Sequence, residues 1–135
     1  MGLSLITRRA RLALVRDAIL AFGGGAVHVY GNTYPGQDVP SPDPPLFIRS
    51  LDAADLVLHP TDASMSLEVE GNVALSGTAN WARFVDGAGT PVDDRSAGPP
   101  GSGAHLIVTD NALPPTANLY PGGVVTLAIT FIEAL

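Results

Sequence analysis

The chain opens with apolar residues at helical spacing. Residues 7–22 carry one apolar stripe at intervals of three, four and three, formed by Leu12, Val15, Ile19 and Phe22. Thr7 is a suitable N-cap, with Ser4 as an alternative, and the three glycines at 23–25 provide a stop. The pattern predicts an N-terminal α-helix over 7–22.

After the glycines the apolar period changes to two. The clearest alternation is Met65, Leu67 and Val69 against serine and glutamate, which predicts a half-buried strand. Other short strands are predicted at 26–30, 46–49, 56–59, 73–78, 80–85, 90–94, 104–109 and 124–132. The last is apolar on both faces, which is typical of a strand in the middle of a sheet or beneath a partner chain. Together they predict a mainly-β, antiparallel sandwich or jelly roll with one N-terminal helix.

The 135 residues are sufficient for a single domain spanning 1–135. Its predicted parts are the helix at 7–22, a loop or arm at 33–45 and a β-sandwich core at 46–135. The 33–45 segment holds five prolines, which fix φ and remove backbone donors, so we expect it to be extended and unpaired. Glycine and proline also predict loops at 95–103 and 110–121.

Charge is scarce and unevenly distributed. Charged residues make up 15% of the chain, against about 25% in ordinary soluble domains, which indicates a surface partly covered by neighbours. Residues 1–25 hold four arginines and one acid, a net charge of +3, whereas 26–135 hold three arginines and twelve acids, a net of −9. This balance argues against nucleic acid as a partner. We expect partner contacts at the 33–45 loop and at the four N-terminal arginines, Arg8, Arg9, Arg11 and Arg16, although these also suit a solvated helix face.

No motif indicates catalysis, a cofactor or a metal. The three histidines (His28, His59 and His105) show no ligand spacing, and the acidic pairs Asp52/Asp55 and Asp93/Asp94 lack the oxygen ladder of a calcium loop. The stretch 86–89 is expected to be a structural turn. The apolar segment 12–22 is too short for a membrane span and is interrupted by charge.

The single tryptophan lies two residues from an arginine in the strand predicted at 80–85. Trp81 and Arg83 therefore form a candidate partner-binding patch, because tryptophan and arginine dominate interface hot spots. Packing of Trp81 in the core is the alternative interpretation.

Two stretches carry a resemblance to a known family. The helix Thr7-Arg8…Val15-Arg16-Asp17-Ala18-Ile19, followed by glycines and a strand, resembles the opening of a group of small virion proteins of tailed bacteriophages. The segment 77–89 (GTANWARFVDGAG) is similar to that group's signature, W-x-R-hydrophobic-V-D-x-x-G, and the strands at 103–108 and the C-terminus follow in the same order. The proline-rich loop at 33–45 departs from the pattern.

The resemblance implies a capsid decoration, or cement, protein with a jelly-roll-like fold and no catalytic residues. Such a protein binds the major capsid protein on the outside of the virion, as a dimer or trimer, after synthesis in the host cytoplasm. The alternatives are a neck, collar or tail component, and a carbohydrate-binding jelly-roll module with Trp81 as a stacking platform.

Overall fold

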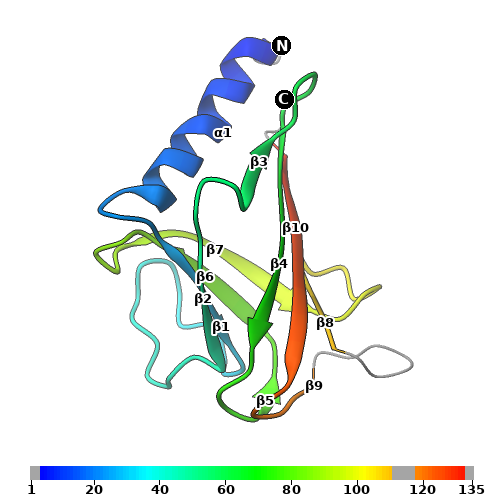
Figure 1. Ribbon diagram of the computed structural model, residues 1–135. Coiled ribbons are helices and arrows are strands. Elements are labelled where there is room, and N and C mark those ends of the chain that lie inside the picture. The colour runs from blue at the N-terminus through cyan, green and yellow to red at the C-terminus, as the bar shows by residue number, and fades with distance from the viewer. Residues whose placement is uncertain (1–3, 111–117, 133–135) are drawn as a thin grey trace.

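The computed structural model describes residues 4–110 and 118–132 (Figure 1). Its elements, in chain order, are α1 (Leu5–Leu20), β1 (Ala26–Tyr30), β2 (Phe47–Ser50), β3 (Leu56–Leu58), β4 (Ser64–Asn72), β5 (Gly77–Thr78), β6 (Trp81–Val85), β7 (Pro91–Gly98), β8 (Leu106–Thr109), β9 (Asn118–Leu119) and β10 (Val124–Ile132). The prediction of a mainly-β, sandwich-like domain with one leading helix is confirmed.

Eight of these strands form one curled sheet in the order β2-β1-β6-β7-β8-β10-β4-β3, and β5 pairs with β9 apart from it. The curl brings β2, at one end of this order, into contact with β4, where Arg49 Nε donates to the carbonyl oxygen of Glu70 at 2.8 Å. The sheet is therefore a half-barrel. The expectation of an entirely antiparallel sheet is wrong for one pair, because β7 and β8 run parallel over two residues each.

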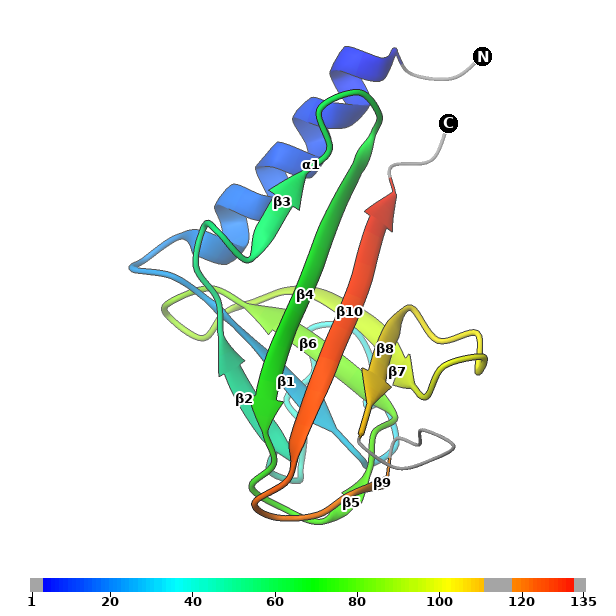
Figure 2. The same ribbon diagram turned by 45° about the vertical axis from the view of Figure 1, so that its right-hand side comes forward.

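One core fills the space enclosed by the curl. Phe84 of β6 meets Phe131 of β10 edge to face, with ring centroids 5.3 Å apart. Helix α1 lies beside β3 and β4 (Figure 2), and buries Leu12 and Ile19 in the same core. The helix thus covers the core where it lies against β3 and β4.

The helix begins and ends earlier than predicted. Ser4 is the N-cap, since its Oγ accepts a hydrogen bond from the Thr7 N–H at 3.2 Å, so the alternative N-cap is the correct one. Ala21 is extended and ends the helix. Phe22, predicted on the buried stripe, lies beyond the helix at φ 58° and is 77% exposed.

Several strand boundaries also differ from the prediction. Strand β7 continues to Gly98, into the segment predicted as a loop, because its last residues pair with β6 and β8. Only 77–78 of the predicted 73–78 strand are extended in a ladder, and 118–119, predicted as loop, pair with them. Of the predicted 110–121 loop, residues 111–117 lie outside the described residues.

The C-terminal strand β10 is central, as predicted, with β4 on one side and β8 on the other. The prediction that both its faces are buried is wrong for the chain by itself. Alternate residues Val125, Leu127, Ile129 and Phe131 face the core, whereas Ile132 on the outer face is 72% exposed.

Candidate functional site

The main polar cluster of the domain is built on a charged pair between β6 and β7. Arg83 and Asp94 lie directly opposite each other in the two antiparallel strands. The guanidinium donates twice to the carboxylate, from Nε to Oδ1 at 2.8 Å and from Nη2 to Oδ2 at 3.0 Å. Only 5% and 10% of the two side chains are exposed. A buried pair of this kind requires further hydrogen bonds to offset its lost hydration.

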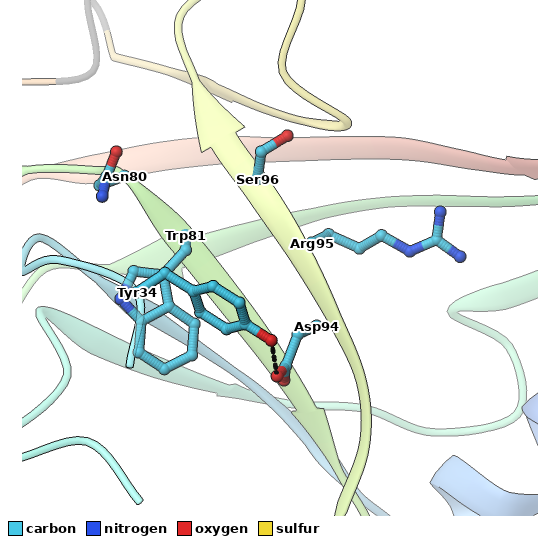
Figure 3. A pocket seen from close by; sticks show the side chains of 6 residues that line it. All are labelled: Tyr34, Asn80, Trp81, Asp94, Arg95 and Ser96. Atoms are coloured by element: carbon cyan, nitrogen blue, oxygen red, sulfur yellow. Dashed lines mark hydrogen bonds between the residues drawn. The ribbon is translucent and has the colours of Figure 1, made fainter. Parts of the chain in front are cut away.

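The proline-rich loop supplies those hydrogen bonds. Arg83 Nη1 donates to the carbonyl oxygen of Val39 at 2.7 Å, and Nη2 donates to that of Gly36 at 3.2 Å. On the other side, the Tyr34 hydroxyl donates to Asp94 Oδ2 at 2.8 Å (Figure 3). A segment poor in N–H donors is well suited to bind through its carbonyls, and a guanidinium provides five donors. The 33–45 loop is irregular, as predicted, but this part of it is fastened to its own sheet.

Aromatic rings complete the cluster around Trp81. Tyr30 stacks on the indole with ring centroids 4.2 Å apart, and Tyr34 meets it edge-on at 5.2 Å. The Arg83 guanidinium lies 5.0 Å from the indole centre, and the indole N–H donates to Asn32 Oδ1 at 3.0 Å. We name these residues, Tyr30, Asn32, Tyr34, Trp81, Arg83 and Asp94, the Arg83 cluster.

The expectation that Trp81 and Arg83 offer a patch to a partner is therefore corrected. The two residues are 2% and 4% exposed, because Tyr30 and the 33–45 loop cover them. The alternative interpretation, a packing role for Trp81, agrees with the structure. The same burial leaves Trp81 without a free face on which a sugar could stack.

Burial and charge shift the ionisation of this cluster. Burial alone would raise the pKa of Asp94, but the hydrogen bonds from Arg83 and Tyr34 and the charge of Arg83 outweigh it and lower that pKa below 3.8. The hydrogen bond to Asp94 raises the pKa of Tyr34, and burial raises the pKa of Tyr30. Asp94 therefore contributes stability that is complete above pH 3.8 and is lost as the pH falls through its lowered folded-state pKa.

A hollow of about 310 Å³ borders the cluster and is lined by Tyr34, Asn80, Trp81, Asp94, Arg95 and Ser96 (Figure 3). Its polar groups already have partners within the chain. Asn80 Nδ2 donates to the Asn32 carbonyl at 2.9 Å, and Ser96 Oγ accepts from the His105 N–H at 3.0 Å. Arg95 extends away from Trp81 and Tyr34 (Figure 3), lies 5.0 Å from the centre of the Phe131 ring and pairs with Asp93 at 2.8 Å.

Arg9 and Arg16 donate hydrogen bonds to carbonyl oxygens of the chain itself. Arg16 donates from Nε to the Leu56 carbonyl at 3.0 Å and from Nη2 to the Ala53 carbonyl at 3.2 Å. Arg9 Nη2 donates to the His59 carbonyl at 2.8 Å. The seven-residue spacing of Arg9 and Arg16 places both on the helix face that meets β3. Their predicted role as partner contacts is therefore corrected.

The other two arginines differ from each other. Arg8 is half-buried, and its Nε has no hydrogen-bond partner among the residues that the structure describes. Arg11 is exposed but also has an interaction within the structure, and its role as a partner contact stays a prediction.

The acidic pairs have structural roles in turns and ion pairs. Asp52 Oδ1 accepts from the Ala54 N–H at 3.0 Å, and Asp55 Oδ2 accepts from the Asp52 N–H at 2.9 Å. Asp86 Oδ1 accepts from the Ala88 N–H at 2.9 Å, which confirms the predicted turn. Within 4–110 and 118–132, no three histidine or acidic side chains gather in a way that could hold a metal ion.

We expect His28 to make the protein less stable as the pH falls from 7 to 5. Burial and the nearby Arg83 charge lower the pKa of His28 below 6.5, and its ring lies 3.4 Å from the Tyr30 hydroxyl. The unfolded chain therefore takes up a proton just below pH 6.5, where the folded protein does not, and stability is lost by up to about 1.4 kcal/mol per pH unit.

Urea unfolding at several pH values checks this prediction. The His28→Gln variant should lose less stability than the parent protein over that range. The matched control is His105→Gln, at an exposed position before β8, which should retain the parent's pH dependence. Equal curves for His28→Gln and the parent would contradict the expectation.

In the described part of the chain, no helix combines the length and the apolar character required to cross a membrane. Comparisons of the whole chain with protein-family models, with curated proteins and with solved structures found no match.

Proposed function

We propose that this protein is a structural, non-enzymatic component of a tailed-bacteriophage virion. Its role is that of a decoration protein that binds the major capsid protein on the outside of the head and stabilises it across subunit junctions. The resemblance of residues 7–19 and 77–89 to such proteins supports the family, and the fold is compatible with it.

The observation that carries the proposal is large apolar exposure on a weakly charged surface. Ile6, Phe22 and Ile132 are 82%, 77% and 72% exposed, in a chain of which only 15% is charged. The main polar cluster, by contrast, is filled by the chain's own loop. These three side chains lie on different segments, α1, the loop after it and β10, so the apolar exposure is distributed over the domain. A protein arranged in this way is suited to assembly.

The outer face of β10 is the surface that we assign to the capsid. The apolar sequence of this strand suits either the middle of a sheet or a place beneath a partner chain, and Val124 and Ile132 remain exposed on its outer face. Across the ladder, Ile132 and Thr130 lie opposite Ser64 and Ser66 of β4. Small neighbours leave the isoleucine prominent on the outside of the curled sheet, which suits contact with another protein.

Mixing the purified protein with undecorated capsids of the virus that encodes it tests the proposal. We expect cosedimentation at hundreds of copies per particle and a higher temperature of capsid disruption. Ile132→Asp should weaken binding, whereas the matched control Ile48→Asp, at a 53% exposed position on β2, should not. Absence of both binding and stabilisation would refute the decoration role.

A neck, collar or tail position in the virion is the second candidate. It shares the supporting resemblance and the exposed apolar surface. Copy number in purified virions separates the two, since a neck or tail protein would be present in a dozen copies or fewer.

A further inference from the structure

The first part of the proline-rich loop, residues 33–40, lies on the sheet without entering the core. Figure 1 shows the loop in cyan, where it leaves the end of β1 and returns to β2. No residue from 33 to 45, a range that the structure describes throughout, is buried, and Tyr34 and Val39 are 42% and 44% exposed. By contrast, Trp81 and Arg83 beneath it are 2% and 4% exposed. The 33–40 stretch therefore shields buried groups while it buries little apolar surface of its own.

The hydrogen bonds that hold this stretch on the sheet converge on one ion pair. The bonds of Gly36, Val39 and Tyr34 described above all end on Arg83 or Asp94. The guanidinium and the carboxylate also bind each other, so the pair stays intact when those three bonds break. Breaking them is partly offset, because water then hydrates the exposed pair. Detachment of the stretch is therefore compatible with an intact sheet.

The two ends of the stretch are fastened separately from its middle. Before it, Asn80 Nδ2 donates to the Asn32 carbonyl, and after it, Ser41 Oγ accepts from Asn32 Nδ2 at 3.1 Å. Between these points Asp38 has φ 60°, a left-handed conformation that is unfavourable for a residue with a Cβ atom. Detachment would relieve this strain, with Asn32 and Ser41 as the hinge points.

We propose that residues 33–40 are a lid that opens locally, while the sheet stays folded, and thereby uncovers Trp81 and Arg83. Local stability is lowest where a segment buries few apolar contacts, and the lid meets that condition. Tyr30 belongs to β1 and would remain stacked on Trp81. The open form would then present tyrosine, tryptophan and arginine together, which are the residue types enriched in interface hot spots. The lid would thus control whether these side chains are accessible to a partner.

Urea unfolding followed with two probes tests the proposal. Trp81 is the only tryptophan in the chain, so its fluorescence reports the lid, whereas far-ultraviolet circular dichroism reports the sheet and the helix. Two probes give the same transition only when a protein unfolds in one step. In the parent protein we expect the fluorescence transition at a lower urea concentration than the circular dichroism transition.

The Tyr34→Phe variant tests how the lid is held closed. It lacks the hydroxyl that donates to Asp94 but keeps the ring that meets Trp81. We expect the open population to rise about tenfold, seen as stronger quenching of Trp81 by acrylamide without urea and as an earlier fluorescence transition. The circular dichroism transition should not move, because the lid is already open when the sheet unfolds. The matched control is Tyr120→Phe, at a 68% exposed position after β9, which should change neither transition.

Two outcomes would overturn the proposal. Coincident transitions in the parent protein would mean that Trp81 is uncovered only when the whole domain unfolds. An equal shift of both transitions in Tyr34→Phe would mean that the hydroxyl stabilises the entire domain and not a lid. Capsid binding enters none of these measurements, so failure of the decoration role would leave the lid unaffected.

Discussion

Replacement of Arg83 by methionine is expected to lower the free energy of unfolding by about 3–5 kcal/mol. The substitution leaves the Asp94 carboxylate, of which only 10% of the side chain is exposed, without its cation. It also removes the donors that hold the carbonyls of Val39 and Gly36, so the 33–45 loop loses its main anchor. The loss should appear in equilibrium urea unfolding at neutral pH.

Two further variants distinguish the buried charge from the lost contacts. Adding Asp94→Asn to the Arg83→Met variant should recover part of the stability, because an uncharged amide then replaces the unpaired carboxylate. Arg95→Met breaks the neighbouring pair with Asp93, whose side chains are 29% and 25% exposed, and should cost only about 1 kcal/mol. If the two variants lost the same free energy of unfolding, burial would not make the Arg83–Asp94 pair more important for stability than the Arg95–Asp93 pair.

The second large effect is expected at Gly25, between α1 and β1. A Cβ atom added there would overlap the carbonyl oxygens of Ile19 and Val85, which belong to the backbones of α1 and β6. Backbone atoms cannot rotate away as a side chain can, so the helix would have to move from the sheet. We expect Gly25→Ala to lower the free energy of unfolding by about 3 kcal/mol, at the upper end of overpacking effects, as measured by urea unfolding.

Gly89 provides the matched control for this prediction. It has φ +83°, but an added Cβ would meet nothing within 4 Å. Gly89→Ala should therefore carry only the backbone penalty of the left-handed region, about 1–2 kcal/mol. If Gly25→Ala lowered the free energy of unfolding no more than Gly89→Ala does, the close approach of helix and sheet at Gly25 would not be the cause of the loss.

Much of the fold could be predicted where one face of an element is buried and the other is solvated. The alternation at 65–70 is visible because β4 has glutamates and serines on its outer face. The extension of β7 to Gly98 was missed, because glycine and proline in 95–103 favour a loop by composition. Only pairing with β6 and β8, which is a tertiary contact, keeps 95–98 extended.

Only part of the Arg83 cluster can be predicted from the sequence. The sequence indicates Trp81 and Arg83 as candidates, but it presents Asp94 only as half of the acidic pair Asp93/Asp94. The turn at 86–89 places residues near 94 opposite Arg83, yet a register shift between Phe84 and Val85 obscures the exact partner. Tyr34 and Val39 reach the cluster from the 33–45 loop, and the path of this loop cannot be predicted because its sequence has no regular pattern of apolar residues. The roles of Arg9 and Arg16 likewise depend on how the helix docks.

The arginine contacts at β3 also have a consequence for how copies can associate. This strand is one of the two outermost of the eight, and an exposed strand edge invites another chain to add by backbone pairing. Arg16 holds the Leu56 carbonyl, and at the other end of the sheet Arg49 ties β2 to β4. An incoming strand would have to displace a guanidinium before it could pair. Open-ended growth into fibrils by strand addition is thereby disfavoured. Copies are expected to associate through faces of the domain instead, and such contacts can form closed assemblies of limited size.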